Sequence, residues 1–285
     1  MENLYSGTGE VHFGLVKCEV DSSCPPQQYP LYTIYFISNG SGTFHADFGK
    51  FKFSGPALLF STPLQQIYLE PDGRLNFIQM QFHGDFYCIE YHRNEVACNG
   101  LLFNSIYIDP IVTLTNEQAV SFSDLLGEIF SEHENPHTSD IVLRAYLQLF
   151  LAKSSSIKLQ SLKESNGFAK DQAMEEFKQL LEENFLNLRK PSDYATLLAM
   201  SPNNFTRRCS TYFKKSPSAM IQERIILESK KQLHLTRLSI KEIAYNLKFQ
   251  DEFYFSRVFK KSVKVSPQAF RKQTGISIVA DLSKA

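Results

Sequence analysis

The chain has 285 residues and a net charge of zero, with 30 basic and 30 acidic side chains. This length allows two domains, each with its own core. No apolar run approaches the roughly 18 residues of a membrane span, and the first residues lack the pattern of a secretory signal peptide, so we expect a cytoplasmic protein without a membrane partner. The cysteines include no C-x-x-C pair, which predicts reduced thiols and no metal site at Cys18, Cys24, Cys88, Cys98 and Cys209.

The zero net charge conceals a division between two halves of the chain. Residues 1–160 carry 8 basic and 17 acidic side chains, whereas residues 161–285 carry 22 basic and 13 acidic ones. A strongly basic half favours a polyanionic partner, nucleic acid before a membrane surface. The two halves are therefore predicted to differ in function.

Residues 1 to about 110 are rich in short aromatic and β-branched runs. These runs lie at 32–37, 42–46, 51–53, 57–60 and 75–82, and turn-forming residues separate them at 39–42, 54–56 and 71–73. Short strands at this spacing predict an antiparallel sandwich or barrel. In 75–82 Leu75 and Phe77 share one face with two glutamines, while Ile78, Met80 and Phe82 share the other, so the pattern leaves open which face lines a cavity.

The hydrophobic period changes to that of a helix between 115 and 153. Thr115 is the expected N-cap of a first helix, a break follows at 135–137, and a second helix runs from about 139 to 152. The apolar coverage is wide, which fits either an intrachain core or half of a dimer interface. Residues 154–168 are polar and aperiodic, so we expect a linker there. A helix is expected to resume at 169–185.

The basic half contains an internal repeat about fifty positions apart. Phe205-Thr-Arg-Arg-Cys209, followed by Ser216-Pro217, recurs as Phe255-Ser-Arg-Val-Phe259, followed by Ser266-Pro267. A repeat of this length indicates one supersecondary unit used twice, here helix, turn, helix. Ser201 and Asp251 are the expected N-caps of the second helix in each copy, and the spacer helix should reach about residue 235.

Each second helix has an apolar face and a polar face. The polar face carries Asn203, Thr206 and Arg207 in the first copy and Glu252, Phe253, Ser256 and Arg257 in the second. Arginine can bind guanine and asparagine can bind adenine in the major groove, so these side chains are candidate base-reading residues. Side chains near the helix ends are candidate phosphate contacts, namely Ser210, Lys214, Lys215, Lys260, Lys261 and Lys264.

Three segments of the basic half form a recognisable signature: Ser201-Pro-Asn-Asn-Phe-Thr-Arg-Arg, Ile240-Lys-Glu-Ile-Ala and Tyr254-Phe-Ser-Arg-Val-Phe-Lys-Lys. Because of these segments, residues 169–273 resemble the AraC/XylS transcription regulators. The resemblance implies a seven-helix DNA-binding domain whose third and sixth helices enter successive major grooves of double-stranded DNA. It assigns base contacts to the seven base-reading candidates above. Family members usually have glycine at the positions of Lys214, Lys248 and Lys264, and phenylalanine at the position of Cys209.

By architecture, the N-terminal half resembles the cupin-like barrel and dimerisation helices of this family. The resemblance implies an α+β protein with a sensor and dimerisation domain at 1–153, a linker at 154–168, a DNA-binding domain at 169–274 and a tail at 275–285. It implies a homodimer through 115–153, a small-molecule effector and RNA polymerase as further partners. Alternation offers six candidate effector contacts: Tyr32, Ile34, Phe36, Phe44, Phe60 and Phe77.

Two alternatives stay open. In one, the regulator has no ligand and the barrel serves only dimerisation. In the other, the barrel is a metalloenzyme, which would need a His-x-His pair, but His12, His45, His83 and His92 are isolated. We therefore expect no enzymatic activity, no catalytic residues and no cofactor.

Overall fold

The computed structural model describes residues 3–5, 11–23, 25–47, 49–87, 101–103, 106–135, 139–165 and 171–276. It divides into two compact units. The first holds the chain up to Glu164 except Ile106–Ile108, and the second holds Ile106–Ile108 and the chain from Ser165 onward. The sequence did not predict that residues 106–108 would belong to the second unit. In the second unit Tyr107 donates its hydroxyl to Glu182 Oε1 at 2.6 Å.

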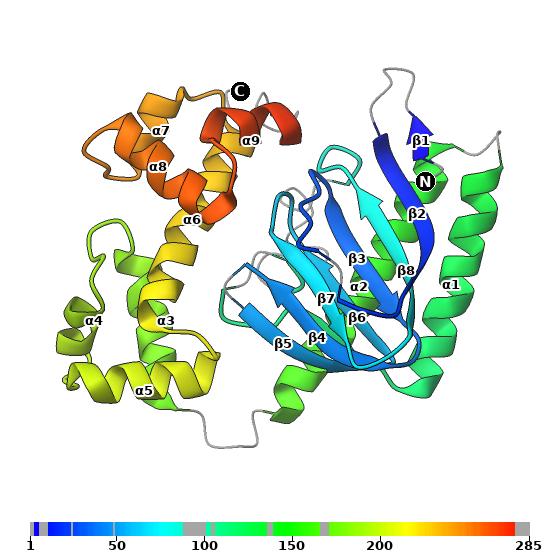
Figure 1. Ribbon diagram of the computed structural model, residues 1–285, viewed down its shortest axis with the longest axis horizontal. Helices are drawn as coiled ribbons and strands as arrows, with labels where there is room; N and C mark the ends of the chain where they lie inside the picture. The colour runs from blue at the N-terminus through cyan, green and yellow to red at the C-terminus, as the bar shows by residue number, and fades with distance from the viewer. Residues whose placement is uncertain are drawn as a thin grey trace. The chain divides into compact units, whose positions relative to one another are not determined.

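Antiparallel strands form two sheets in the first unit, as the sequence predicted (Figure 1). The larger sheet has the order β1-β2-β8-β3-β6-β9 and the smaller one the order β5-β4-β7. The strands span β1 Asn3–Tyr5, β2 Val11–Val20, β3 Tyr32–Ile37, β4 Ser41–Ala46, β5 Gly49–Ser54, β6 Ala57–Ser61, β7 Ile67–Pro71, β8 Leu75–Phe82 and β9 Ile111–Thr113. Of these, β1, β2, β7 and β9 were missed because their alternation is short or mixed with polar residues.

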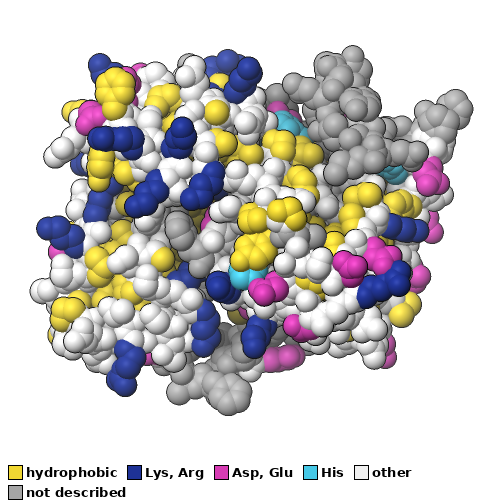
Figure 2. All heavy atoms as spheres, in the orientation of Figure 1, with side chains coloured by type: hydrophobic (Ala, Val, Ile, Leu, Met, Phe, Trp, Pro, Cys, Tyr) yellow, Lys and Arg dark blue, Asp and Glu magenta, His cyan; other side chains and the backbone are white. Residues whose placement is uncertain are grey.

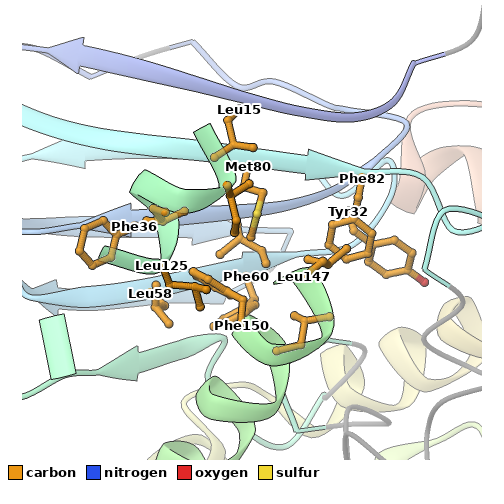
Figure 3. Packing of buried hydrophobic residues seen from close by; sticks show 14 of the residues in the cluster. Leu15, Tyr32, Phe36, Leu58, Phe60, Met80, Phe82, Leu125, Leu147 and Phe150 are labelled. Carbon is orange, nitrogen blue, oxygen red and sulfur yellow. The ribbon is translucent and has the colours of Figure 1, made fainter. Parts of the chain in front are cut away.

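The larger sheet is buried on both faces, which explains its unbroken apolar runs. Every residue of β3 is buried. One face joins the smaller sheet in a core that includes Tyr35, Phe44 and Phe77. The other face packs on the helices in a core that includes Phe60 and Phe150 (Figure 3). Burying one such phenylalanine contributes roughly 1.5–3 kcal/mol, so both cores stabilise the unit.

Two long helices, α1 Asn116–Glu134 and α2 Asp140–Ser165, cover that second face. Thr115 is the N-cap of α1, as predicted. It also forms a capping box with Gln118, which was not predicted. The predicted linker is wrong over residues 154–165, because α2 continues to Ser165, and residues 166–168 lie outside the described residues. The buried Ser154 hydroxyl is satisfied inside the helix, because its Oγ donates to the Phe150 carbonyl at 2.8 Å. Buried Lys158 pairs with Asp109 at 2.7 Å.

The described part of the second unit contains seven helices, as the resemblance implied. The helices described there are α3 Gln172–Asn184, α4 Pro191–Leu197, α5 Pro202–Phe213, α6 Pro217–Leu235, α7 Ile240–Asn246, α8 Glu252–Val263 and α9 Pro267–Thr274. Figure 1 shows α6 running from the group of α3, α4 and α5 to the group of α7, α8 and α9. The two copies of the repeat thus lie at the two ends of one helix.

Candidate nucleic-acid interface

The turn between the two helices has the same backbone geometry in both copies. Ala199 in the first copy and Lys248 in the second have positive φ angles, 51° and 59°. The Met200 N–H donates to the Ala195 carbonyl at 2.8 Å, and the equivalent bond from Phe249 measures 2.9 Å. This pattern is the Schellman motif that ends a helix. In both copies the chain therefore turns in the same way between the first helix and the second helix.

The first reader is helix α5, which Ser201 caps as predicted by accepting from the Asn204 N–H. Phe205, Cys209 and Phe213 are buried on its inner face. The Phe205 ring lies 4.9 Å from the ring of Phe177 in α3, an edge-to-face contact. The outer face carries the predicted residues, all of them exposed: Asn203, Thr206, Arg207, Ser210 and Lys214.

The second reader is helix α8, which Asp251 caps through the Tyr254 N–H. Phe255 and Phe259 are buried on its inner face. Among the predicted base-reading residues Phe253 and Arg257 are exposed, and Glu252 and Ser256 are half-buried. The predicted phosphate contacts on this side are all exposed, namely Lys260, Lys261 and Lys264.

Sulfur side chains replace an aromatic pair in the core of the first copy. Phe259 packs edge-to-face on Phe270 at 5.6 Å, whereas at the equivalent positions Cys209 Sγ lies 3.4 Å from Met220 Sδ. Burial raises the pKa of the Cys209 thiol to about 12, so it is a neutral core group. The smaller Cys209 side chain is thus accompanied by Met220, because a flexible methionine can fill the space that an aromatic ring would occupy.

Two adjacent arginines of α5 have different environments. Arg208 binds Asp171, the N-cap of α3, through Nε at 2.9 Å and through a second guanidinium nitrogen. Its hydrogen bond holds the pKa of Asp171 below the ordinary value, against the opposing effect of burial. Arg207 is exposed, and within the described residues its guanidinium donates to Asn204 on its own helix at 3.3 Å. Arg207 is therefore the arginine that can reach a partner.

The residue three positions before the outward arginine contacts it in both copies. Asn204 accepts from Arg207, and the Arg257 guanidinium lies 5.8 Å from the centre of the Tyr254 ring. Side chains three apart are neighbours on a helix, so each can orient its arginine. Neither Asn204 nor Tyr254 was among the predicted site residues. The sequence signal that could have identified them is their equivalent position in the repeat, three residues before the outward arginine in each copy.

Three lysines occupy left-handed positions where glycine has no steric cost. Lys214, Lys248 and Lys264 have φ angles of 58°, 59° and 69°. Lys214 Nζ donates to the Thr211 carbonyl at 2.9 Å, and Lys264 Nζ makes the same contact three residues back at 3.0 Å. A cation on the last carbonyls of a helix is favourable, which offsets part of the strain of about 1 kcal/mol.

Lys215 was predicted to contact phosphate, but its position in the structure does not allow this role. Its side chain is only 9% exposed and its Nζ lies 2.6 Å from Glu223 Oε2. The same Nζ donates to the Ile106 carbonyl at 3.3 Å. An ammonium group held in this buried ion pair cannot reach phosphate without a large cost, so Lys215 is a structural residue.

Basic side chains gather on the second unit. Figure 2 shows lysine and arginine side chains grouped over the region where Figure 1 places α7, α8 and α9. Exposed apolar side chains occur on the same helices, with Phe253 at 73%, Tyr254 at 48% and Tyr245 at 80% exposure. Positive charge with accessible aromatic rings is typical of a nucleic-acid interface.

The predicted effector contacts divide between the two cores of the first unit. Phe44 and Phe77 belong to the core between the sheets. Tyr32, Phe36 and Phe60 point toward helix residues such as Phe150 (Figure 3). Ile34 belongs to that second core as well. Those four residues pack the larger sheet on the helices, whereas Phe44 and Phe77 lie between the two sheets.

The histidines of the first unit that the structure describes are engaged in local contacts. His45 Nε2 lies 2.9 Å from Glu70 Oε2, and its ring stacks on Tyr68 at 3.9 Å. His83 Nδ1 accepts from the Asp85 N–H at 3.1 Å. The side chain of His12 and the whole of His92 lie outside the described residues. Within the described ranges, no three His, Cys, Asp or Glu side chains form a group that could hold a metal ion.

Within the described residues, neither Cys18 nor Cys209 is in a disulfide bond, while Cys24, Cys88 and Cys98 lie outside the described residues. In the portion of the chain that is described, no helix is both long and apolar enough to cross a membrane.

Comparison with known proteins gives matches over the repeat. Residues 194–273 match the family model described as a helix-turn-helix domain. The arabinose operon regulatory protein of Escherichia coli K12 is 26% identical over 153 residues, covering 53% of this chain and 51% of that protein. The raffinose operon transcriptional regulatory protein RafR of Pediococcus pentosaceus is 22% identical over 257 residues and 86% of each chain. This chain therefore spans about half the length of the arabinose regulator.

The solved structure of ToxT from Vibrio cholerae is 16% identical, with a TM-score of 0.40, covering 92% of this chain and 98% of that chain. The fold and the family match define a protein with a helix-turn-helix domain. The duplicated motif and the similarity to the arabinose and raffinose operon regulators agree with the resemblance to the AraC/XylS family that the sequence indicated.

Proposed function

We propose that the whole protein is a transcription regulator that binds double-stranded DNA through α5 and α8 in successive major grooves. The observation that carries this proposal is the matched pair Arg207 and Arg257, both exposed at the same place on the second helix of a repeated motif. Each arginine can donate two hydrogen bonds to guanine O6 and N7. Neighbouring Asn203, Thr206 and Ser256 supply further hydrogen-bonding groups for base edges.

The helix between the readers has a suitable length. Helix α6 contains 19 residues, which corresponds to roughly 28 Å of helix. Two recognition helices on one face of B-DNA must lie about 34 Å apart, and the supporting helices add width to the spacer. The exposed phosphate candidates Ser210, Lys214, Lys260, Lys261 and Lys264 would then fix the position of the readers on the backbone.

Selection of bound DNA from random sequence by the purified protein tests this proposal. The expected product contains two enriched segments with centres about 10 base pairs apart, one for each reader. Enrichment of a single short segment would mean that only one reader engages DNA. Recovery of no common sequence would overturn the proposal.

We also propose that the protein is a homodimer through α2. A stripe of apolar and small residues follows this helix at spacings of three and four, and every member is exposed except the half-buried Ala152: Ile141, Ala145, Leu149, Ala152, Ser156 and Leu159. Ile141 is 76% and Leu149 is 48% exposed, although the opposite face of α2 is fully packed in the core. Such a stripe fits a second helix of the same kind.

A small-molecule effector remains part of the proposal, with its site between the two sheets. Buried Gln79 lies next to Tyr35 on β3 and on the same face of β8 as Phe77, and within the described residues its Nε2 has no hydrogen-bond partner. An unsatisfied buried donor costs roughly 1–3 kcal/mol, which an acceptor on a ligand would recover.

Thermal unfolding with a panel of metabolites tests for this effector. A compound that raises the unfolding temperature of the native chain but not of Gln79→Leu supports the site. If no compound stabilises the native chain, the ligand-independent regulator is the better account. RNA polymerase stays a prediction from the family resemblance.

A further inference from the structure

One base-facing side chain of α8 cannot form hydrogen bonds. Phe253 is the second residue of the helix and 73% exposed, so folding leaves most of its ring in water. Arg257, Lys260 and Lys261 follow four, seven and eight positions further along the same helix and are exposed and basic. A large apolar ring on such a surface gains free energy only when a partner covers it.

The two readers differ chemically at this position. By the repeat, Phe253 in α8 occupies the place of Asn203 in α5, and both side chains are exposed. Asparagine can donate to and accept from the adenine edge, whereas a phenyl ring can do neither. The two halves of the bound site should therefore have different sequences, although the arginines Arg207 and Arg257 match.

The major groove offers few apolar groups to a phenyl ring. Guanine, cytosine and adenine present hydrogen-bonding atoms there, while thymine adds its C5 methyl group. We propose that Phe253 packs on a thymine C5 methyl and makes α8 selective for a 5-methylpyrimidine at one position of its half-site. This inference rests on the proposed DNA-binding function. The positive charge around the ring favours DNA over an apolar protein surface as its occupant.

Single thymine-to-uracil replacements in the selected DNA test the proposal, because they remove one methyl group and no hydrogen bond. The native protein should lose about fourfold in affinity at one position of the α8 half-site, the value for one buried methyl at about 0.8 kcal/mol. At that position 5-methylcytosine should bind more tightly than cytosine. Thymines elsewhere should tolerate the change.

Variants at the two equivalent positions provide the matched control. Phe253→Ala should bind the thymine and uracil sites equally well, whereas Asn203→Ala should keep the full methyl effect. Both side chains are exposed, so both variants should unfold at the temperature of the native protein. Phe253→Asn, which copies the first reader, should shift the preference at that position toward adenine.

The outcomes separate this inference from the proposed function. If the native protein selects a specific sequence but no thymine shows a methyl effect, Phe253 does not read thymine. An effect that survives in Phe253→Ala would also overturn the proposal. If no specific sequence is selected at all, the proposed function itself fails.

Discussion

Arg207 and Arg208 are adjacent on α5, but only one is free to reach DNA. Arg208 holds Asp171 at the start of α3, while Arg207 is exposed. We predict that Arg207→Ala weakens binding to the selected DNA by about 1–3 kcal/mol and leaves the free energy of unfolding unchanged. Gel shift and urea unfolding on the same preparations measure the two effects.

Arg208→Ala is the control for Arg207→Ala. It should lower the free energy of unfolding, because Asp171 at the start of α3 loses its hydrogen-bonded partner. It should keep the sequence preference for DNA. The reverse pattern, with Arg208 needed for preference and Arg207 for stability, would contradict the assignment of the outer face of α5.

The inner face of the readers was largely predictable at the level of single residues. The i, i+4 spacing of Phe205, Cys209 and Phe213 was sufficient, because an amphipathic helix has only one apolar side. Lys215 was not predictable in this way. Its buried ion pair depends on Glu223, which lies on the next helix, and no local pattern records that contact.

At the level of helices, we predict that replacing a left-handed lysine with glycine raises the free energy of unfolding without strengthening DNA binding. Lys248→Gly should raise the free energy of unfolding by about 1 kcal/mol, since glycine adopts a positive φ without steric cost. Lys264→Gly should gain less, because it also loses the contact of Nζ with the Lys261 carbonyl. Urea unfolding of the two variants gives the comparison.

The same variants should differ on DNA if Lys264 contacts phosphate. Lys264→Gly should weaken binding to all sequences and lower the salt slope by about one. A lower free energy of unfolding for Lys248→Gly than for the native chain would mean that its left-handed turn is not strained.

Elements with strong periodicity were predicted, and elements governed by tertiary contacts were not. The continuation of α2 through residues 154–165 was missed because its serines read as linker residues. Buried Ser154 and Lys158 are accommodated there by hydrogen bonds to the Phe150 carbonyl and to Asp109, and the contact with Asp109 is not visible in any local pattern. The faces of the larger sheet were ambiguous for a related reason: both are buried, so alternation cannot distinguish them.

For the whole molecule, the exposed stripe on α2 predicts how copies associate. Leu149→Glu should convert a dimer to a monomer at micromolar concentration, because a charge would be buried in the apolar contact. Gln148→Glu introduces the same charge beside the stripe and should leave the dimer intact. Sedimentation measures both, and a native chain that is already monomeric would contradict the proposed dimer.

We expect α5 and α8 to bind two adjacent major grooves of one DNA site. Guanine-methylation interference on the selected site tests it most directly, comparing the native chain with Arg207→Ala and Arg257→Ala. We predict two guanine contacts about one helical turn apart. The first variant should lose one of them and the second variant the other. Loss of the same contact in both variants, or a pattern unchanged in either, would contradict the claim.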